Sequence, residues 1–288
     1  MIDLRTHLAS LVAVFLALGI GILIGVDMIG GKALIAQEKA TARSLEVDLT
    51  NLHHQNVQLG TSLKAQNATI ASLNQFGQET VPVLVAGRLA GVRVAIVTTP
   101  GADAAGLAEV VREAGGAVGP IVALSPLTAS RTNLAASYLG VNGTVSGVDQ
   151  ALAQILSQAL ASGKSGQLPG LRSLGLFRSQ GGFGQTMNAV LLICGRVDGK
   201  DAVASTFGVD FVQDLKNAGV TVVEGESLEV PTAVSTVPLF KGLGIATVDD
   251  VDTPPGQVAV VWGLGGDVGN WGQKVTAQSL MPAIGAGH

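Results

Sequence analysis

Cysteine is nearly absent from this sequence, since Cys194 is the only one in 288 residues. A single cysteine excludes an internal disulfide framework and every metal site that needs several cysteines. Cys194 ends the apolar run Ala189–Ile193, so we expect a buried structural thiol rather than a reactive one. A lack of disulfides occurs on both sides of a membrane, so the redox compartment stays open.

Histidine and methionine are also scarce, and they do not cluster. The histidines fall outside the segments expected to form a globular core, which argues against Ser-His-Asp and Cys-His nucleophile systems. His53 and His54 are adjacent and point to different faces of a helix, so only a site shared between two copies would use His53. The scattered methionines give no soft ligand set for Cu(I). No metal ligand and no cofactor are assigned. The residues are His7, His53, His54, His288, Met1, Met28, Met187 and Met281.

Charged residues make up only 13% of the chain, and the formal net charge is −4. No Lys/Arg cluster is present, so we expect no nucleic-acid partner. Hydrophobic residues make up 47%, which at this length is enough for a sizeable folded core. Any attachment to a membrane must therefore come from an apolar segment and not from basic patches.

Such a segment stands at residues 8–26, which contain no charged residue. As a helix it would span roughly 28 Å, close to the roughly 30 Å of a hydrocarbon core. A signal peptide would have a shorter apolar run and a small-residue cleavage site, and a buried core helix is the other alternative. We predict an uncleaved anchor over residues 1–32. Arg5 and the amino terminus lie before the span, with Asp27 and Lys32 after it, and we favour a cytoplasmic amino terminus.

Small residues recur at every fourth position of this span. On a helix they form one shallow stripe that another helix could approach closely, although small residues are common in membrane spans in general. This membrane-packing stripe consists of Ala9, Ala13, Ala17, Gly21 and Gly25.

Residues 33–80 have apolar spacing that alternates between three and four, which predicts a coiled-coil stalk. As a helix, the part from about residue 33 to 76 would span roughly 60 Å. Asn56 falls at an a position, where asparagine pairs with asparagine across a parallel dimer. We therefore expect a parallel homo-oligomer, with a dimer favoured. The alternative is an amphipathic helix lying on the protein's own globular domain. The seam consists of Leu49, Asn56, Leu63 and Ile70 at a, and Leu45, Leu52, Leu59 and Leu73 at d.

A globular α/β domain is predicted over residues 81–288, because Gly77 and Pro82 are expected to end the stalk helix. Two strand-helix-strand units predict parallel strand pairing. The first comprises a strand at 92–97, a loop at 98–102, a helix capped by Asp103 and ending at 114–116, and a strand at 117–124. The second comprises a strand at 189–193, a turn at 196–201, a helix at 207–216 and a strand near 222–223.

Three other segments complete the domain. Residues 127–160 have a helical pattern, and residues 162–184 are rich in Gly and Ser and predict a loop, insertion or lid. The apolar run Val258–Trp262 predicts a last strand. The leading fold is an open, mostly parallel sheet of the Rossmann or flavodoxin kind, with helices on both faces.

No segment of this domain matches a catalytic or nucleotide-binding motif well. Gly263–Gly265 resembles a dinucleotide loop, but Val268 replaces the third glycine, and Ser179–Thr186 lacks the lysine of a P-loop. Asp103, Asp198 and Asp201 follow predicted strands and are more simply helix caps or turn residues. We therefore do not expect an enzyme; an enzyme on a stalk would need a deep pocket with convergent acids.

The N-terminal residues 2–7 and 10–21 closely resemble the start of the mycobacterial copper transport protein B family of bacterial copper transporters. Residues 91–97, 235–237 and 247–252 resemble it less specifically. This resemblance implies an envelope protein that takes part in copper efflux or limits copper accumulation, with copper as the transported ion. It also implies the channel-forming outer-membrane role described for mycobacterial members. With one apolar span and no evident series of barrel strands, a pore would need oligomers or another segment.

We therefore expect an α/β domain outside the cytoplasm, displayed on a parallel coiled-coil stalk from one anchor in a lipid bilayer. The alternative is a non-transporting envelope scaffold or sensor that the coil dimerises.

Overall fold

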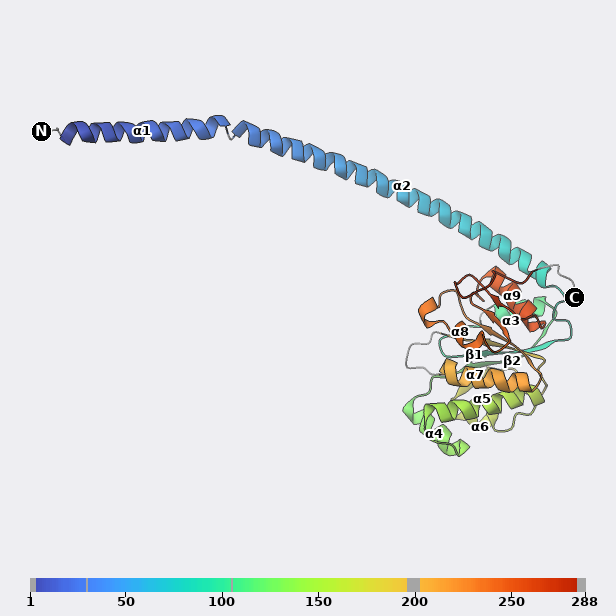
Figure 1. Ribbon diagram of the computed structural model, residues 1–288. Helices are drawn as coiled ribbons and strands as arrows, with labels where there is room; N and C mark the ends of the chain where they lie inside the picture. The colour runs from blue at the N-terminus through green and yellow to red at the C-terminus, as the bar shows by residue number, and fades with distance from the viewer. Residues whose placement is uncertain (1–3, 30, 105, 196–202, 284–288) are drawn as a thin grey trace. The chain divides into compact units, whose positions relative to one another are not determined.

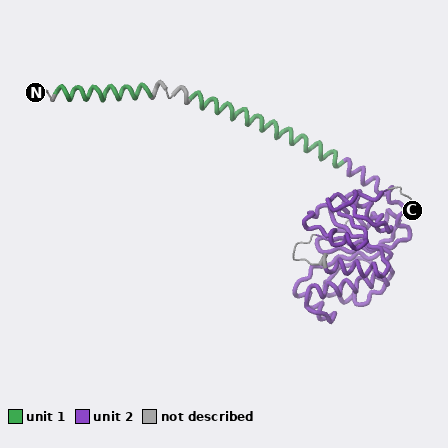
Figure 2. Tube along the Cα trace, viewed as in Figure 1, with its two compact units in different colours: residues 1–71 green, residues 72–288 purple. Residues whose placement is uncertain are grey.

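The computed structural model describes residues 4–29, 31–104, 106–195 and 203–283, and the chain divides into two compact units, residues 1–71 and 72–288 (Figure 2). The first unit begins with helix α1, Leu4–Ile29. Its segment Arg5–Gly25 is long and apolar enough to cross a membrane, and none of it is buried. The predicted N-terminal apolar helix is confirmed.

Helix α2 runs without interruption from Gly31 to Val85, so the predicted end at Gly77–Pro82 is wrong. Pro82 lies in the last turn, where only one backbone hydrogen bond is lost. Val81 and Val85 are 2% and 0% exposed, and they pack into the core of the second unit. The burial of Val81 and Val85 therefore keeps α2 helical past Pro82, where local sequence preferences alone would end the helix.

The second unit contains a seven-stranded sheet in the order β3-β2-β1-β4-β5-β6-β7. Strand β3 pairs antiparallel with β2, and the other neighbouring strands pair in parallel. The predicted open, mostly parallel sheet is thus confirmed. The strands are β1 Arg93–Thr98, β2 Ala117–Leu124, β3 Phe177–Gln180, β4 Ala189–Ile193, β5 Thr221–Gly225, β6 Ala246–Val248 and β7 Asn270–Trp271.

Helices cover both faces of this sheet (Figure 1). Ala95 and Val97 of β1 face the core on one side, while Val94 and Ile96 face the core on the other, as the two-residue period of a strand requires. The first face carries α4 Ala129–Leu139, α5 Val145–Ser162, α6 Leu168–Ser173 and α7 Val203–Asn217. The second carries α3 Leu107–Glu113, α9 Pro254–Leu264 and the end of α2. A short 3₁₀ turn, Thr232–Val234, and helix α8, Val237–Phe240, follow β5.

The run Val258–Trp262 was predicted as a strand, and it is the middle of α9. Its side chains are all buried, so neither a helical nor a strand period is visible in the sequence. The helix signal lies just upstream, where Thr253 accepts a hydrogen bond from the backbone N–H of Gly256 at 3.2 Å and Pro254 begins the first turn.

Two further predictions need correction. Residues 162–184 do not form only a loop: they contain α6 and the edge strand β3, whose Phe177 is buried. Helix α3 begins at Leu107 with Gly106 as its N-cap residue, so Asp103 is not the N-cap of this helix. The predicted turn at 196–201 lies outside the described residues.

Candidate functional site

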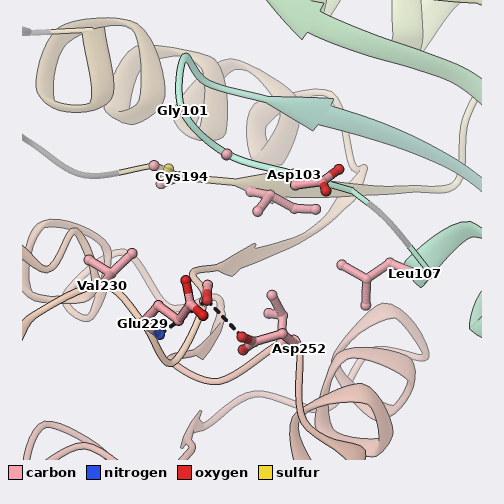
Figure 3. A pocket seen from close by; sticks show the side chains of 12 residues that line it. Gly101, Asp103, Leu107, Cys194, Glu229, Val230 and Asp252 are labelled. Atoms are coloured by element: carbon pink, nitrogen blue, oxygen red, sulfur yellow. Dashed lines mark hydrogen bonds between the residues drawn. The ribbon is translucent and has the colours of Figure 1, made fainter.

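A crevice opens at the carboxyl ends of β1, β4, β5 and β6, where the chain order of the sheet reverses between β1 and β4. This reversal point is where open α/β sheets bind ligands, because the loops that follow the two central strands diverge there. Its volume is about 310 Å³. Figure 3 shows the side chains that line it. The lining residues are Gly101, Ala102, Asp103, Leu107, Ile193, Cys194, Gly195, Ser227, Glu229, Val230, Val251 and Asp252.

The floor of the crevice is fixed where the loops after β1 and β4 meet. The backbone N–H of Gly195 donates to Thr99 Oγ1 at 2.8 Å, and the Thr99 N–H donates to the Ile193 carbonyl oxygen at 2.9 Å. A Cβ at position 195 would collide with the Pro100 carbonyl oxygen, so only glycine allows this approach.

The polar lining of the crevice is acidic. Figure 3 shows Asp103 and Cys194 on one side and Glu229 and Asp252 on the other. Asp252 Oδ2 accepts from Ser227 Oγ at 2.7 Å, and Oδ1 accepts from the Leu228 N–H at 2.8 Å. The lining residues that the structure describes include no Lys, Arg or His.

A buried polar cluster lies next to the crevice, centred on Glu226. This side chain is 0% exposed and forms an ion pair with Lys274, at 2.7 Å between Nζ and Oε1. Its carboxylate also accepts from Ser235 Oγ at 2.6 Å and from the Thr236 N–H at 2.9 Å. Two charges removed from water in this way need both the ion pair and the additional donors.

Glu224, two residues earlier and also 0% exposed, belongs to the same cluster. It accepts from Thr236 Oγ1 at 2.6 Å, and its second oxygen has no partner among the described residues. Burial raises its pKa to about 8, opposed by the Thr236 hydrogen bond, with the nearby Glu226 charge raising it further. Glu224 is therefore mostly protonated at neutral pH.

Cys194 connects the crevice to this cluster, because it lines the crevice and contacts Glu224 and Thr236. Its side chain is 1% exposed. Burial is the main reason that its pKa is well above the ordinary thiol value, and the Glu224 carboxyl adds to this. The thiol is thus buried and protonated, as expected from the sequence, and it is not an activated nucleophile.

A pair of buried aspartates follows β6. Asp249 Oδ1 accepts from the N–H groups of Gln273 and Lys274 at 2.8 and 3.1 Å. Asp250 Oδ2 accepts from Thr253 Oγ1 at 3.0 Å and from the Gln273 side-chain amide at 3.2 Å. Burial raises the pKa of Asp250 to about 6. The contacts with Gln273 and Lys274 hold the segment after β7 against the end of β6.

These buried acids were missed by sequence reasoning, although the signal was present. Glu224 lies near the end of β5 and Glu226 follows that strand, while Asp249 and Asp250 follow β6. The end of a strand is the position that drew attention to Asp103. Two of the segments that carry the family resemblance, 235–237 and 247–252, supply Thr236, Asp249 and Asp250. The resemblance therefore includes residues that build the buried polar cluster.

The predicted candidates elsewhere are not brought together. Asp103 is exposed and lines the crevice, while Asp198 and Asp201 lie outside the described residues. His53 and His54 are exposed on α2, with ring centroids 6.4 Å apart. In the described part of the chain, no group of three or more His, Cys, Asp or Glu side chains could hold a metal ion. Gly263–Gly265 ends a helix and does not follow a strand, so it is not a dinucleotide loop.

The membrane-packing stripe and the seam are both uncovered in the described chain. A Cβ added at Gly21 or Gly25 would meet nothing within 4 Å, and Ala9, Ala13 and Ala17 are exposed. The apolar members of the seam are 55–66% exposed, and Asn56 is exposed with them; these are Leu45, Leu49, Leu52, Leu59, Leu63, Ile70 and Leu73.

Comparison with known proteins gives one consistent result. Residues 1–282 match the family model described as "Copper transport outer membrane protein, MctB". Proteins named "Copper transporter MctB" from Mycobacterium bovis and from two strains of Mycobacterium tuberculosis are 28% identical over 319 aligned positions. That alignment covers 97% of this chain and 99% of each relative. Because the family model covers nearly the whole chain, the protein belongs to the MctB family of copper transport outer membrane proteins.

Proposed function

We propose that this protein is a membrane-anchored bacterial envelope protein that takes part in copper efflux or limits copper accumulation. The observation that carries the proposal is the family match over residues 1–282, together with relatives named as copper transporters that align over almost their full length. The family name denotes a transporter, and we propose no catalytic activity. Copper is the cargo in this proposal, and we assign no residue as its ligand.

The proposed arrangement in the envelope follows from the order of segments. The helix at about residues 8–26 crosses the bilayer once, supported by the apolar segment Arg5–Gly25 of α1. Arg5 precedes the span, which favours a cytoplasmic amino terminus and an α/β domain on the other side, over residues 81–288. Residues 33–80 form the stalk and pair with a second copy in parallel, supported by the heptad seam and Asn56.

A non-transporting scaffold or sensor is the second candidate. The uncovered seam of α2 favours it, because a long helix that pairs two copies sets the spacing between their domains without requiring any passage for an ion. The two candidates predict different responses to copper.

The deciding experiment compares three strains of the source bacterium: wild type, a deletion strain, and the deletion strain complemented with the full-length gene. Growth is measured over a series of copper concentrations, and cell-associated copper is measured by mass spectrometry. Copper transport predicts lower tolerance and higher cellular copper in the deletion strain, both restored by the gene. Zinc in place of copper serves as the control metal. Unchanged tolerance together with unchanged cellular copper would refute the transport role and favour the scaffold.

A further inference from the structure

The heptad face of α2 is exposed from Leu45 to Leu73. Its seven apolar seam residues, from Leu45 to Leu73, are each 55–66% exposed. Covering their exposed surface on two copies would remove on the order of 1,000 Å² of apolar surface from water. That is close to the lower limit for a stable protein–protein interface, so a helix of the same sequence is a sufficient partner.

Farther along α2, the next heptad positions lie against the protein's own α/β domain. The a position after Ile70 is Gly77, and the d position after Leu73 is Thr80. A Cβ at Gly77 would lie 2.7 Å from the Cβ and Cγ atoms of Pro254, at the start of α9. One turn later, Val81 is 2% exposed and belongs to the core of the α/β domain. From Gly77 onward the helix is therefore packed against its own chain.

These two observations set a length for the pairing. We propose that α2 pairs with a second copy only from Leu45 to Leu73, and that the contact between Gly77 and Pro254 ends the paired segment. The inference rests on the parallel dimer proposed above, and adds where it stops. In a coiled coil, a side chain at an a position fits among four residues of the facing helix. At Gly77 that space belongs to Pro254, so a partner helix has no room there.

The features of the seam select a second copy over a different protein. Asn56 pairs with itself when two identical helices are parallel and in register. The e and g positions that flank the paired segment carry Glu46 and Asp48 at its start, and no Asp, Glu, Lys or Arg between residues 53 and 69. A different helix would normally be chosen by complementary charges at these positions. One anchor helix at the same end of each chain also favours the parallel direction.

Single-cysteine cross-linking of the full-length chain in detergent tests the inference. In a Cys194→Ala background, cysteine is introduced by Leu59→Cys (d), Thr61→Cys (f, outer face) or Thr80→Cys (d, beyond Gly77). Oxidation with diamide is followed on non-reducing gels. In a parallel dimer equivalent d positions come within disulfide distance, so Leu59→Cys should cross-link at least tenfold faster than either other variant. Thermal unfolding followed by tryptophan fluorescence verifies that each variant is folded.

Three outcomes would overturn the inference in different ways. Rapid cross-linking of Thr80→Cys, equal to that of Leu59→Cys, would show that the paired segment continues past Gly77, while the dimer itself would stand. Rapid cross-linking of Thr61→Cys would show that the seam is on another face of the helix. No cross-linking of Leu59→Cys would refute both the end point and the parallel dimer on which it rests.

Discussion

Replacing Lys274 with methionine should strongly destabilise the α/β domain. The ammonium of Lys274 is 2.7 Å from the Glu226 carboxylate, and the two side chains are 6% and 0% exposed. Removing one partner of a buried ion pair leaves an uncompensated charge, which costs about 3–5 kcal/mol of unfolding free energy. Lys274 also donates to the Ser227 carbonyl oxygen at 2.9 Å, and this contact would be lost too. At about 2–4 °C per kcal/mol, Tm should fall by roughly 6–20 °C.

Tryptophan fluorescence isolates this domain, because the chain has two tryptophans and both, Trp262 and Trp271, lie in its core. The full-length protein in detergent is unfolded by heat and by urea at pH 7. Lys241→Met is the matched control: Lys241 is exposed and, among the residues that the structure describes, donates only to the Thr276 carbonyl oxygen, at 3.2 Å. Its loss should therefore cost less than about 0.5 kcal/mol.

The double variant Lys274→Met with Glu226→Gln sharpens the test, since it removes the carboxylate charge as well as its partner. It should recover most of the lost stability, because a neutral amide tolerates burial with the Ser235 and Thr236 hydrogen bonds that remain. If the single variant is as stable as Lys241→Met, or if the double variant is no more stable than the single one, the buried ion pair does not stabilise the domain as argued.

Three further predictions use the same fluorescence assay. The pKa of Glu224 is about 8 in the folded chain, against an ordinary value of 4.5, so the folded state keeps a proton that the unfolded state releases. The free energy of unfolding should therefore fall as pH rises from about 4.5 to 8. Glu224→Gln should flatten that fall between pH 5 and 8, and an unchanged slope would contradict it. Gly77→Ala should lower the free energy of unfolding by about 1–3 kcal/mol, because the added Cβ clashes with Pro254. The control Gly60→Ala should lower it by nothing, because nothing lies within 4 Å of its added Cβ. Equal effects of the two variants would argue against the contact. A fragment of residues 72–288 should unfold cooperatively, whereas a fragment of residues 90–288 should be unfolded. The shorter fragment lacks the buried side chains of Val81, Val85 and Leu89, each of which contributes about 1.5–3 kcal/mol to a total unfolding free energy of about 5–15 kcal/mol.

The parallel part of the sheet could be read from the sequence because its strands are short runs of β-branched and aliphatic residues followed by helices. β1, β2, β4 and β5 were recognised in this way, as were α3, α5 and α7. Val258–Trp262 has the same composition but is helical, because a segment buried on all sides carries no period. Its correct reading depended on Thr253 and Pro254, which together form a helix start.

The end of α2 and the site were less accessible to sequence reasoning, because both depend on contacts between distant segments. Pro82 is a strong local signal for a helix end, and only the burial of Val81 and Val85 outweighs it. Asp103 could be placed near the crevice from its position after a strand. The pairing of Glu226 with Lys274, 48 residues apart, has no local pattern that would reveal it.

The burial of the last turns of α2 determines how the domain would respond to mechanical force. The helix that begins at Gly31 ends in the α/β core at Val85, with no intervening linker. Tension applied through an anchor at the amino end of this helix would therefore act directly on the packing of Val81 and Val85, because no flexible linker would first be extended. The domain would begin to yield at that packing, and the load needed to extract these two valines would set the force at which the attachment fails.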